Sequence, residues 1–148
     1  MVYKEEERDL FSVPEEYYLA HCISADFGMR AGIVVAFNEN FDMKRILQTK
    51  YPKYLQLWQE SGCLGDCILE GRVLNLITKE RCSDYPTYGA LQTALCRCKT
   101  ICLKEGIEKI AMPLIGCGID QLKWEHVSEI IKNVFHDTAI EVLVCIWK

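Results

Sequence analysis

Hydrophobic residues follow two patterns that alternate along this chain. Short, almost wholly apolar runs, such as Tyr17–Ile23 and Val73–Thr78, are typical of strands buried on both faces of a sheet. Longer segments with an apolar residue every three or four positions are typical of helices that bury one side. The clearest of these is Thr87–Lys104, which Pro86 precedes and Gly106 ends.

The same patterns predict the remaining elements. Further strands are expected at Cys67–Glu70, Lys109–Met112 and Ile140–Trp147, and further helices at Ile33–Phe37, from an Asp42 cap to about Lys50, and at Gln121–Phe135. Gly71 separates two of the strands and predicts a hairpin. Alternating strands and helices predict a layered α/β domain with a mixed, largely parallel sheet. Ligands of such domains bind beyond the carboxyl ends of the strands.

Length, charge and hydropathy narrow the class of protein. The 148 residues suit a single domain, 1–148. A formal net charge of −4 argues against a broad nucleic-acid surface. No apolar run reaches the roughly 20 residues of a membrane span, and the N-terminus lacks the apolar core of a signal peptide. We therefore expect an intracellular protein, in the nucleus or the cytoplasm, without membrane contact and monomeric.

The cysteine content is high, at nine residues. An odd count without a secretion signal argues against a disulfide framework. No Cys-x-x-Cys pair occurs, His21, His126 and His136 have no metal-ligand spacing, and Cys98 and Cys102 fall on the apolar stripe of a predicted helix. No metal site and no cofactor are therefore expected.

Two segments share the order strand, glycine-containing turn, helix. They are Ser24–Gly32 and Pro113–Asp120. Glycine lets a backbone approach a ligand closely, and the first turn of a helix offers N–H groups to an anion. Either loop alone could be a simple turn. Two such loops at strand ends, however, could hold a diphosphate between them.

Two polar side chains at these strand ends could carry chemistry. Lys79 follows the strand Val73–Thr78, and Asp120 closes the second glycine loop. Lys79 could equally be a solvated surface residue; as a nucleophile it must lose a proton, which desolvation or a cation such as Arg81 would promote. Asp120 could also be the N-cap of the last helix, a role compatible with facing a ligand.

Three further residues have more than one interpretation. Asp9 is either a turn residue or an acceptor for an exocyclic amine. His21 lies in a predicted buried strand, where a hydrogen-bonded core histidine is more common than a catalyst. Cys117 lies in the second loop, but no histidine nearby in the sequence is available to activate it as a nucleophile.

Five motifs in this order resemble one branch of a known family, the macrodomain hydrolases of the terminal ADP-ribose protein glycohydrolase type, also described as O-acetyl-ADP-ribose deacetylases. The likeness runs from about Asp9 to the final strand. The motifs are Leu19–Ser24, Met29–Ile33, Leu76–Lys79, Pro86–Tyr88 and Gly116–Asp120. The asparagine-rich strand end and triple-glycine loop of another macrodomain hydrolase branch do not occur here.

The resemblance implies a three-layer α/β/α macrodomain with ADP-ribose in a cleft above the sheet. Lys79 matches the nucleophile of that branch and Asp120 its general acid/base, with no metal. The residues implied to bind the substrate are Asp9, Leu10 and Trp147 around adenine, Ser24, Arg30, Ala31, Gly32 and Ile33 around the distal ribose and phosphates, and Leu114, Ile115, Gly116, Cys117, Gly118 and Ile119 as the second phosphate loop.

The activity implied is hydrolysis of the ester between ADP-ribose and a glutamate or aspartate side chain, or of O-acyl-ADP-ribose, on ADP-ribosylated proteins. Two alternatives stay open: removal of ADP-ribose from DNA, and a reader that binds ADP-ribose without cleaving it. The chain departs from the branch at Arg8 and Arg30, where glycine is usual, and at Leu114, where arginine is frequent. These departures bear on affinity and substrate preference and leave Lys79 and Asp120 in place.

Overall fold

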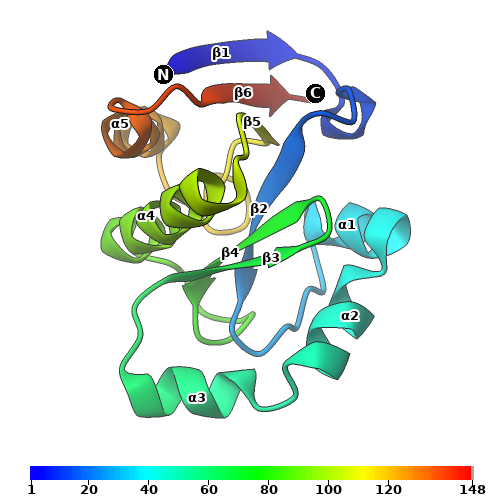
Figure 1. The fold of residues 1–148 in the computed structure, drawn as a ribbon. Helices are drawn as coiled ribbons and strands as arrows, with labels where there is room; N and C mark the ends of the chain where they lie inside the picture. The colour runs from blue at the N-terminus through cyan, green and yellow to red at the C-terminus, as the bar shows by residue number, and fades with distance from the viewer. Residues whose placement is uncertain (148) are drawn as a thin grey trace.

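The fold is built on one six-stranded sheet. A computed structural model describes residues 1–147, and its strands lie in the order β1-β6-β5-β2-β4-β3 (Figure 1). All neighbours are parallel except β3 and β4, which form the predicted hairpin around Gly71. The strands are β1 (Val2–Glu7), β2 (Tyr18–Ser24), β3 (Asp66–Glu70), β4 (Val73–Lys79), β5 (Lys109–Met112) and β6 (Glu141–Ile146).

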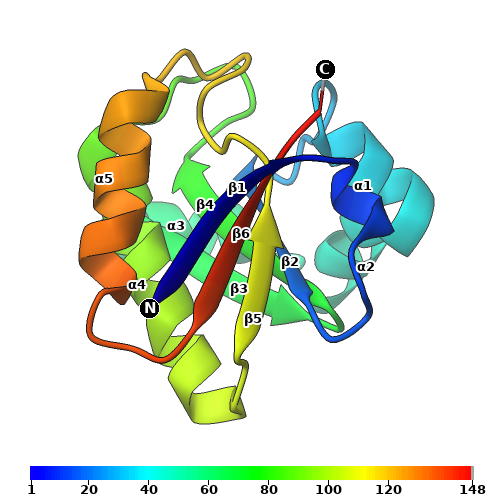
Figure 2. The ribbon, with the colours of Figure 1, turned by 90° about the horizontal axis from the view of Figure 1, so that it is seen from above.

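Helices cover both faces of this sheet. Figure 2 shows α4 and α5 on one side of the strands and α1 and α2 on the other. The helices are α1 (Val34–Phe41), α2 (Met43–Lys50), α3 (Tyr54–Ser61), α4 (Tyr88–Glu105) and α5 (Trp124–Phe135). The predicted three-layer α/β/α fold with a mixed, largely parallel sheet is confirmed. Within residues 1–147, no helix combines the length and apolar character that crossing a membrane requires.

Strand β4 shows why the sequence folds in layers. Every residue from Val73 to Thr78 is buried, because helices cover both faces. Leu74 and Leu76 pack into the core that contains α4 and α5. Val73 and Ile77 point the other way, into the core that contains α1, α2 and Trp58 of α3. Because successive side chains of a strand point to opposite faces of the sheet, β4 contributes to two separate hydrophobic cores.

Several elements differ from the sequence-based expectation. Strand β1 and helix α3 were not expected, and α5 begins at Trp124 instead of Gln121. Asp42 precedes α2 as expected, but its side chain does not cap the helix. Its carboxylate forms an ion pair with Arg45. The Asn38 side chain instead accepts a hydrogen bond from the Lys44 N–H at 3.0 Å. Asp42 has a left-handed backbone, with φ of 53°, because it also ends α1.

The parallel strands place their carboxyl ends at one edge of the sheet. Ser24 ends β2, Lys79 ends β4, Met112 ends β5 and Ile146 ends β6. Ser24 is the register partner of Lys79 across β2 and β4. The segments that follow these strands therefore meet above the same edge, which is where an α/β sheet binds its ligands.

Candidate active site

The structure brings Lys79 and Asp120 together. The Lys79 ammonium donates a hydrogen bond to Asp120 Oδ1 at 2.7 Å, and the two side chains are 11% and 15% exposed. The contact spans 41 positions of the chain. An amine and a carboxylate that touch in a partly enclosed position can exchange a proton directly, as nucleophilic and general acid/base chemistry requires.

This pair lies on the wall of a cavity of about 590 Å³. All the residues that the sequence pointed to as catalytic or substrate-binding line it, including Asp9, Leu10 and Trp147. The cavity is also lined by Met29 and Pro113, which lie in the two predicted glycine loops. Sequence reasoning assigned no role to the other lining residues, which are Cys22, Ile23, Val34, Cys82, Ser83 and Cys145. Cys82 and Ser83 could have been found, since they follow Lys79 at the carboxyl end of β4.

The first glycine loop leads directly into a helix, as expected. It leaves β2 at Ser24 and enters α1 at Val34. Phe27 and Met29 adopt left-handed backbone conformations, with φ of 52° and 45°. Such conformations are costly for side chains other than glycine and persist only where surrounding contacts hold them. Here both side chains are buried, and Phe27 stacks on Tyr54 with ring centroids 5.3 Å apart.

The second glycine loop is built differently from the expectation. Lys123 and not Asp120 occupies the N-cap position of α5, so the N-cap interpretation of Asp120 is wrong. Gly116 has φ of 74°, and a Cβ there would lie 2.9 Å from the Leu122 side chain. The Leu122 N–H donates to the Gly116 carbonyl at 2.7 Å. This closed turn aims Asp120 at Lys79 without the help of a helix.

The two loops approach each other above the cavity. A Cβ on Gly32 of the first loop would lie 3.5 Å from the Ile119 side chain of the second. Gly32 also has φ of 82°, which disfavours any other residue. Backbone from two separate strand ends therefore lines one narrow space, the arrangement expected for holding a diphosphate.

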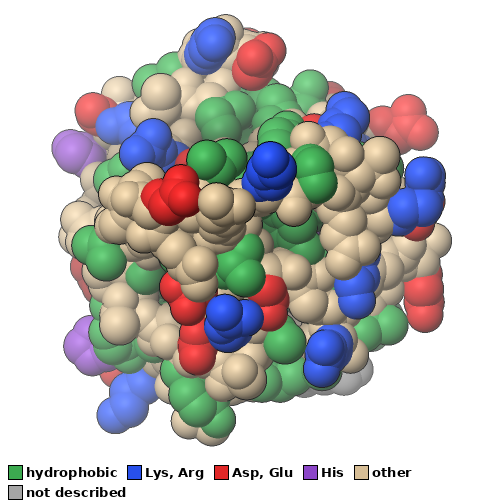
Figure 3. Space-filling model, turned by 90° about the horizontal axis from the view of Figure 1, so that it is seen from below, with side chains coloured by type: hydrophobic (Ala, Val, Ile, Leu, Met, Phe, Trp, Pro, Cys, Tyr) green, Lys and Arg blue, Asp and Glu red, His purple; other side chains and the backbone are tan. Residues whose placement is uncertain are grey.

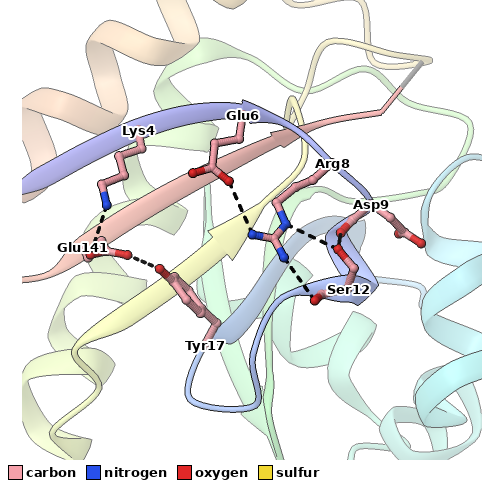
Figure 4. Close-up of polar contacts among 7 residues, drawn as sticks. All are labelled: Lys4, Glu6, Arg8, Asp9, Ser12, Tyr17 and Glu141. Carbon is pink, nitrogen blue, oxygen red and sulfur yellow. Dashed lines mark hydrogen bonds and ion pairs between the residues drawn. The ribbon is translucent and has the colours of Figure 1, made fainter.

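Asp9 lines the same cavity as the ion pair and also has a structural role. Its Oδ1 accepts the Phe11 N–H at 3.0 Å and so caps the short 3₁₀ helix Leu10–Ser12. Arg8 donates to the Ser12 carbonyl at 3.2 Å and fastens this turn, while Figure 4 shows the Asp9 carboxylate directed away from Arg8. Asp9 is thus a turn residue that also lines the cavity, so both of its interpretations are compatible.

The charged and thiol groups near Lys79 limit the possible chemistry. Arg81 lies 3.7 Å from Glu80, and the ion pair that Lys79 makes is with Asp120. Burial raises the pKa of the Cys117 thiol to about 11, so it stays protonated at neutral pH. Burial, followed by the nearby Asp120 charge, also raises the pKa of Cys22. Neither of these two thiols is therefore ionised, whereas the Lys79 ammonium is in contact with a carboxylate that can accept its proton.

Neither the cysteines nor the histidines form a metal site in the described part of the chain. All nine cysteines are free thiols. Among residues 1–147, no group of three or more metal-binding side chains is placed to share an ion. His21 is fully buried, and its Nε2 lies 2.6 Å from Asn75 Oδ1. It is the hydrogen-bonded core histidine that its strand position favoured.

Comparison with known proteins identifies the family. A family model described as the Macro domain matches residues 73–131. The chain is 43% identical to the human ADP-ribose glycohydrolase OARD1 over 137 residues, which cover 92% of this chain and 86% of the human protein. The corresponding protein of Bos taurus is 42% identical over the same shares.

Solved structures show the same fold at lower identity. The macrodomain of Thermus aquaticus DarG superposes with a TM-score of 0.77 at 19% identity, covering 97% of each chain. Thermosipho africanus DarTG, solved in complex with ADP-ribose, gives a TM-score of 0.74 at 19% identity over 98% of this chain and 41% of that one. With its three-layer fold and its two loops over a shared cavity, this chain belongs to the macrodomain family.

Proposed function

We propose that this protein is an ADP-ribose glycohydrolase that cleaves the ester between ADP-ribose and an acidic side chain, with Lys79 as nucleophile. The observation that carries the proposal is the 2.7 Å contact between Lys79 Nζ and Asp120 Oδ1 on the wall of the cavity. Support also comes from the relatives named ADP-ribose glycohydrolase, which match most of the chain. A structural neighbour was solved with ADP-ribose bound.

The proposed reaction begins with the ion pair. Asp120 takes a proton from the Lys79 ammonium, and the free amine attacks the anomeric carbon of the distal ribose. The new C–N bond forms as the C–O bond to the ester breaks, and the glutamate or aspartate leaves as a carboxylate. Asp120 then assists water to replace the lysine at the same carbon, which returns the free amine. General acid/base assistance of this kind contributes about 10²–10⁴ in rate.

Enclosure of the pair is part of this mechanism. The Lys79 and Asp120 side chains are 11% and 15% exposed, so little bulk water screens their interaction. Substrate must enter between them, because the ammonium is engaged by the carboxylate in the free protein. Binding energy from the remote adenosine end, near Asp9 and Trp147, can supply the work of that separation.

Substitution of each member of the pair tests the proposal. Lys79→Ala is expected to reduce release of ADP-ribose from an ADP-ribosylated glutamate peptide to background, and Asp120→Ala by about 10²–10⁴. Calorimetry should show that both variants still bind ADP-ribose. Lys104→Ala is the matched control, because Lys104 is exposed in the last turn of α4. Full activity of Lys79→Ala would remove the lysine mechanism.

A covalent adduct is a second, independent readout. Intact-mass analysis of wild-type protein incubated with ADP-ribose should show an adduct that peptide mapping places on Lys79. The adduct should be missing from Lys79→Ala and should be present, at wild-type level, in the Lys104→Ala control. Tight ADP-ribose binding by wild-type protein without adduct or ester hydrolysis would instead identify a reader module.

ADP-ribosylated protein is the proposed substrate in preference to DNA. The net charge is −4. Figure 3 shows acidic and basic side chains interspersed on the face seen from below, without one broad basic area. Phosphate contacts by lysine and arginine dominate binding to DNA. Turnover of ADP-ribosylated DNA as fast as that of the modified peptide would overturn this preference.

A further inference from the structure

Asp26 is a charged side chain that lies in the first glycine loop but outside the five macrodomain motifs, and the sequence assigned it no role. It lies two residues beyond β2, in the first glycine loop, behind the residues that line the cavity. Its Oδ1 accepts hydrogen bonds from the Ser24 hydroxyl at 2.5 Å and from the Gly28 N–H at 3.0 Å. Its Oδ2 accepts the Cys82 N–H at 3.2 Å. One carboxylate thus joins the end of β2, the first loop and the turn that follows Lys79.

The surroundings hold this carboxylate in a fixed place. The Asp26 N–H donates to the Glu80 carbonyl at 3.0 Å, and the Ala25 N–H donates to the Lys79 carbonyl at 2.9 Å. A Cβ on Gly28 would lie 2.7 Å from Cys82 Sγ, so only glycine fits between the loop and the turn. The loop therefore cannot shift without breaking contacts on both sides of Asp26.

Asp26 is charged at neutral pH. Burial alone would raise its pKa, but the hydrogen bonds from Ser24, Gly28 and Cys82 outweigh burial and lower the pKa below its ordinary value. An ionised carboxylate is an acceptor only, so the Ser24 hydroxyl must be the donor in their contact. Charge-assisted hydrogen bonds of this kind are stronger than neutral ones, which fixes the hydroxyl orientation.

We propose that Asp26 is a positioning residue that orients the Ser24 hydroxyl and so makes Ser24 an acceptor for a sugar hydroxyl group of the ligand. With its single hydrogen directed at Asp26, the Ser24 oxygen has only lone pairs to offer. A phosphate oxygen is itself an acceptor at neutral pH and cannot donate a hydrogen bond to the Ser24 oxygen. A ribose hydroxyl can donate one.

The position of Ser24 beside Lys79 indicates which ribose this is. Ser24 is the partner of Lys79 across β2 and β4 and also lines the cavity. The inference rests on the proposed function, in which Lys79 attacks the distal ribose. The sugar hydroxyl that reaches Ser24 therefore belongs to the distal ribose, and the contact helps to hold the anomeric carbon at the amine.

Two ligands that differ by this sugar test the inference. ADP carries adenosine and both phosphates but lacks the distal ribose. Asp26→Ala and Ser24→Ala should each weaken binding of ADP-ribose about 10-fold, as expected for loss of one hydrogen bond, and change binding of ADP by less than about 3-fold. Asp26→Asn, which keeps an oxygen acceptor, should fall between wild type and Asp26→Ala.

The two residues should act as one unit. We therefore expect the double variant Ser24→Ala/Asp26→Ala to bind ADP-ribose only about as weakly as either single variant. Asp84→Asn is the matched control: its carboxylate accepts the Arg81 N–H at 3.0 Å in the turn that contains Cys82. The control should bind both ligands as wild type does.

Three results would overturn the inference. They are equal weakening of ADP and ADP-ribose by Asp26→Ala, additive losses of about 100-fold in the double variant, and wild-type binding by Asp26→Ala. A loosened loop that merely lowers stability would weaken both ligands together. Selective loss of ADP-ribose binding is therefore the result that a purely structural role does not produce.

Amide hydrogen exchange tests the arrangement without any ligand. The Gly28 and Cys82 amides should exchange slowly in wild-type protein and much faster in Asp26→Ala, with β4 amides unchanged. Unchanged exchange at both positions would refute the fixed placement of Asp26. If wild-type protein shows this protection but binds no ADP-ribose, the proposed function is refuted. The hydrogen bonds of Asp26 to both amides would then be confirmed, and the proposal that Ser24 accepts from the distal ribose would be refuted.

Discussion

Acidification should destabilise this protein through one buried histidine. His21 is fully buried in β2, and its ring stacks on Phe37 with centroids 3.7 Å apart. Asn75 Nδ2 donates to the Ile68 carbonyl, so Asn75 Oδ1 faces His21 and accepts its Nε2 hydrogen. In the described chain the other ring nitrogen, Nδ1, has no hydrogen-bond partner. Protonation there would place an unpaired charge in the core.

The size of this loss of stability follows from the difference between the pKa of His21 in the unfolded and in the folded protein. Burial lowers the pKa of His21 from 6.5 to about 4, and the hydrogen bond with Asn75 offsets only part of that effect. Since the folded value is the lower one, the unfolded chain binds the proton first as pH falls. The stabilisation is therefore fully present above 6.5 and is lost progressively between 6.5 and about 4. At about 1.36 kcal/mol per pH unit, the loss from pH 7 to pH 5 is about 2 kcal/mol.

Urea denaturation at pH 7 and pH 5, followed by tryptophan fluorescence at constant ionic strength, measures this loss. His21→Gln is the matched variant, because an amide can still donate to Asn75 but does not titrate in this range. We expect its unfolding free energy at pH 7 to be lower than that of wild type. Its decrease from pH 7 to pH 5 should, however, be smaller by about 2 kcal/mol. An equal decrease in both proteins would refute the assignment to His21.

Two further predictions concern packing and thiol reactivity. Gly65→Ala should lower the unfolding free energy by about 3 kcal/mol, because its Cβ would lie 2.3 Å from the Ala90 carbonyl oxygen, which cannot move away. Gly118→Ala is the control, since a Cβ there would meet nothing within 4 Å. In the same urea denaturation experiment it should change the unfolding free energy by less than about 0.5 kcal/mol. Mass-spectrometric labelling at pH 7 should modify exposed Cys96 well before Cys117, whose pKa is about 11. Cys117 labelling that keeps pace with Cys96 would contradict the protonated state.

The spacing of apolar residues was sufficient to predict strands that are buried on both faces and helices that bury one side. Strand β4 is covered on both faces, and Leu91, Leu95, Cys98 and Cys102 all lie on the buried side of α4. In both cases the packing that decides the structure leaves a direct trace in the spacing of apolar residues. The order of strands and helices then predicted the α/β class, which the sheet confirms.

Patterns failed where backbone contacts or single turns decide the structure. Strand β1 has five exposed residues out of six and joins the sheet at its edge by backbone pairing with β6, so its side chains carry no apolar signal. Helix α3 buries only Trp58, which is too little periodicity to detect. Asp120 precedes a helix in sequence, but the turn closed by Gly116 and Leu122 separates it from α5.

The sequence by itself predicted the class of fold, which the structure confirms, and its motifs pointed to Lys79 and Asp120 as the candidate catalytic residues. It did not determine what those residues touch. Their 2.7 Å contact crosses 41 positions, and Asp26 gathers donors from Ser24, Gly28 and Cys82. Only the tertiary structure decided these contacts, because parallel strands bring the ends of distant segments to one edge of the sheet. The spacing of residues along the chain does not show which of these segments will be in contact.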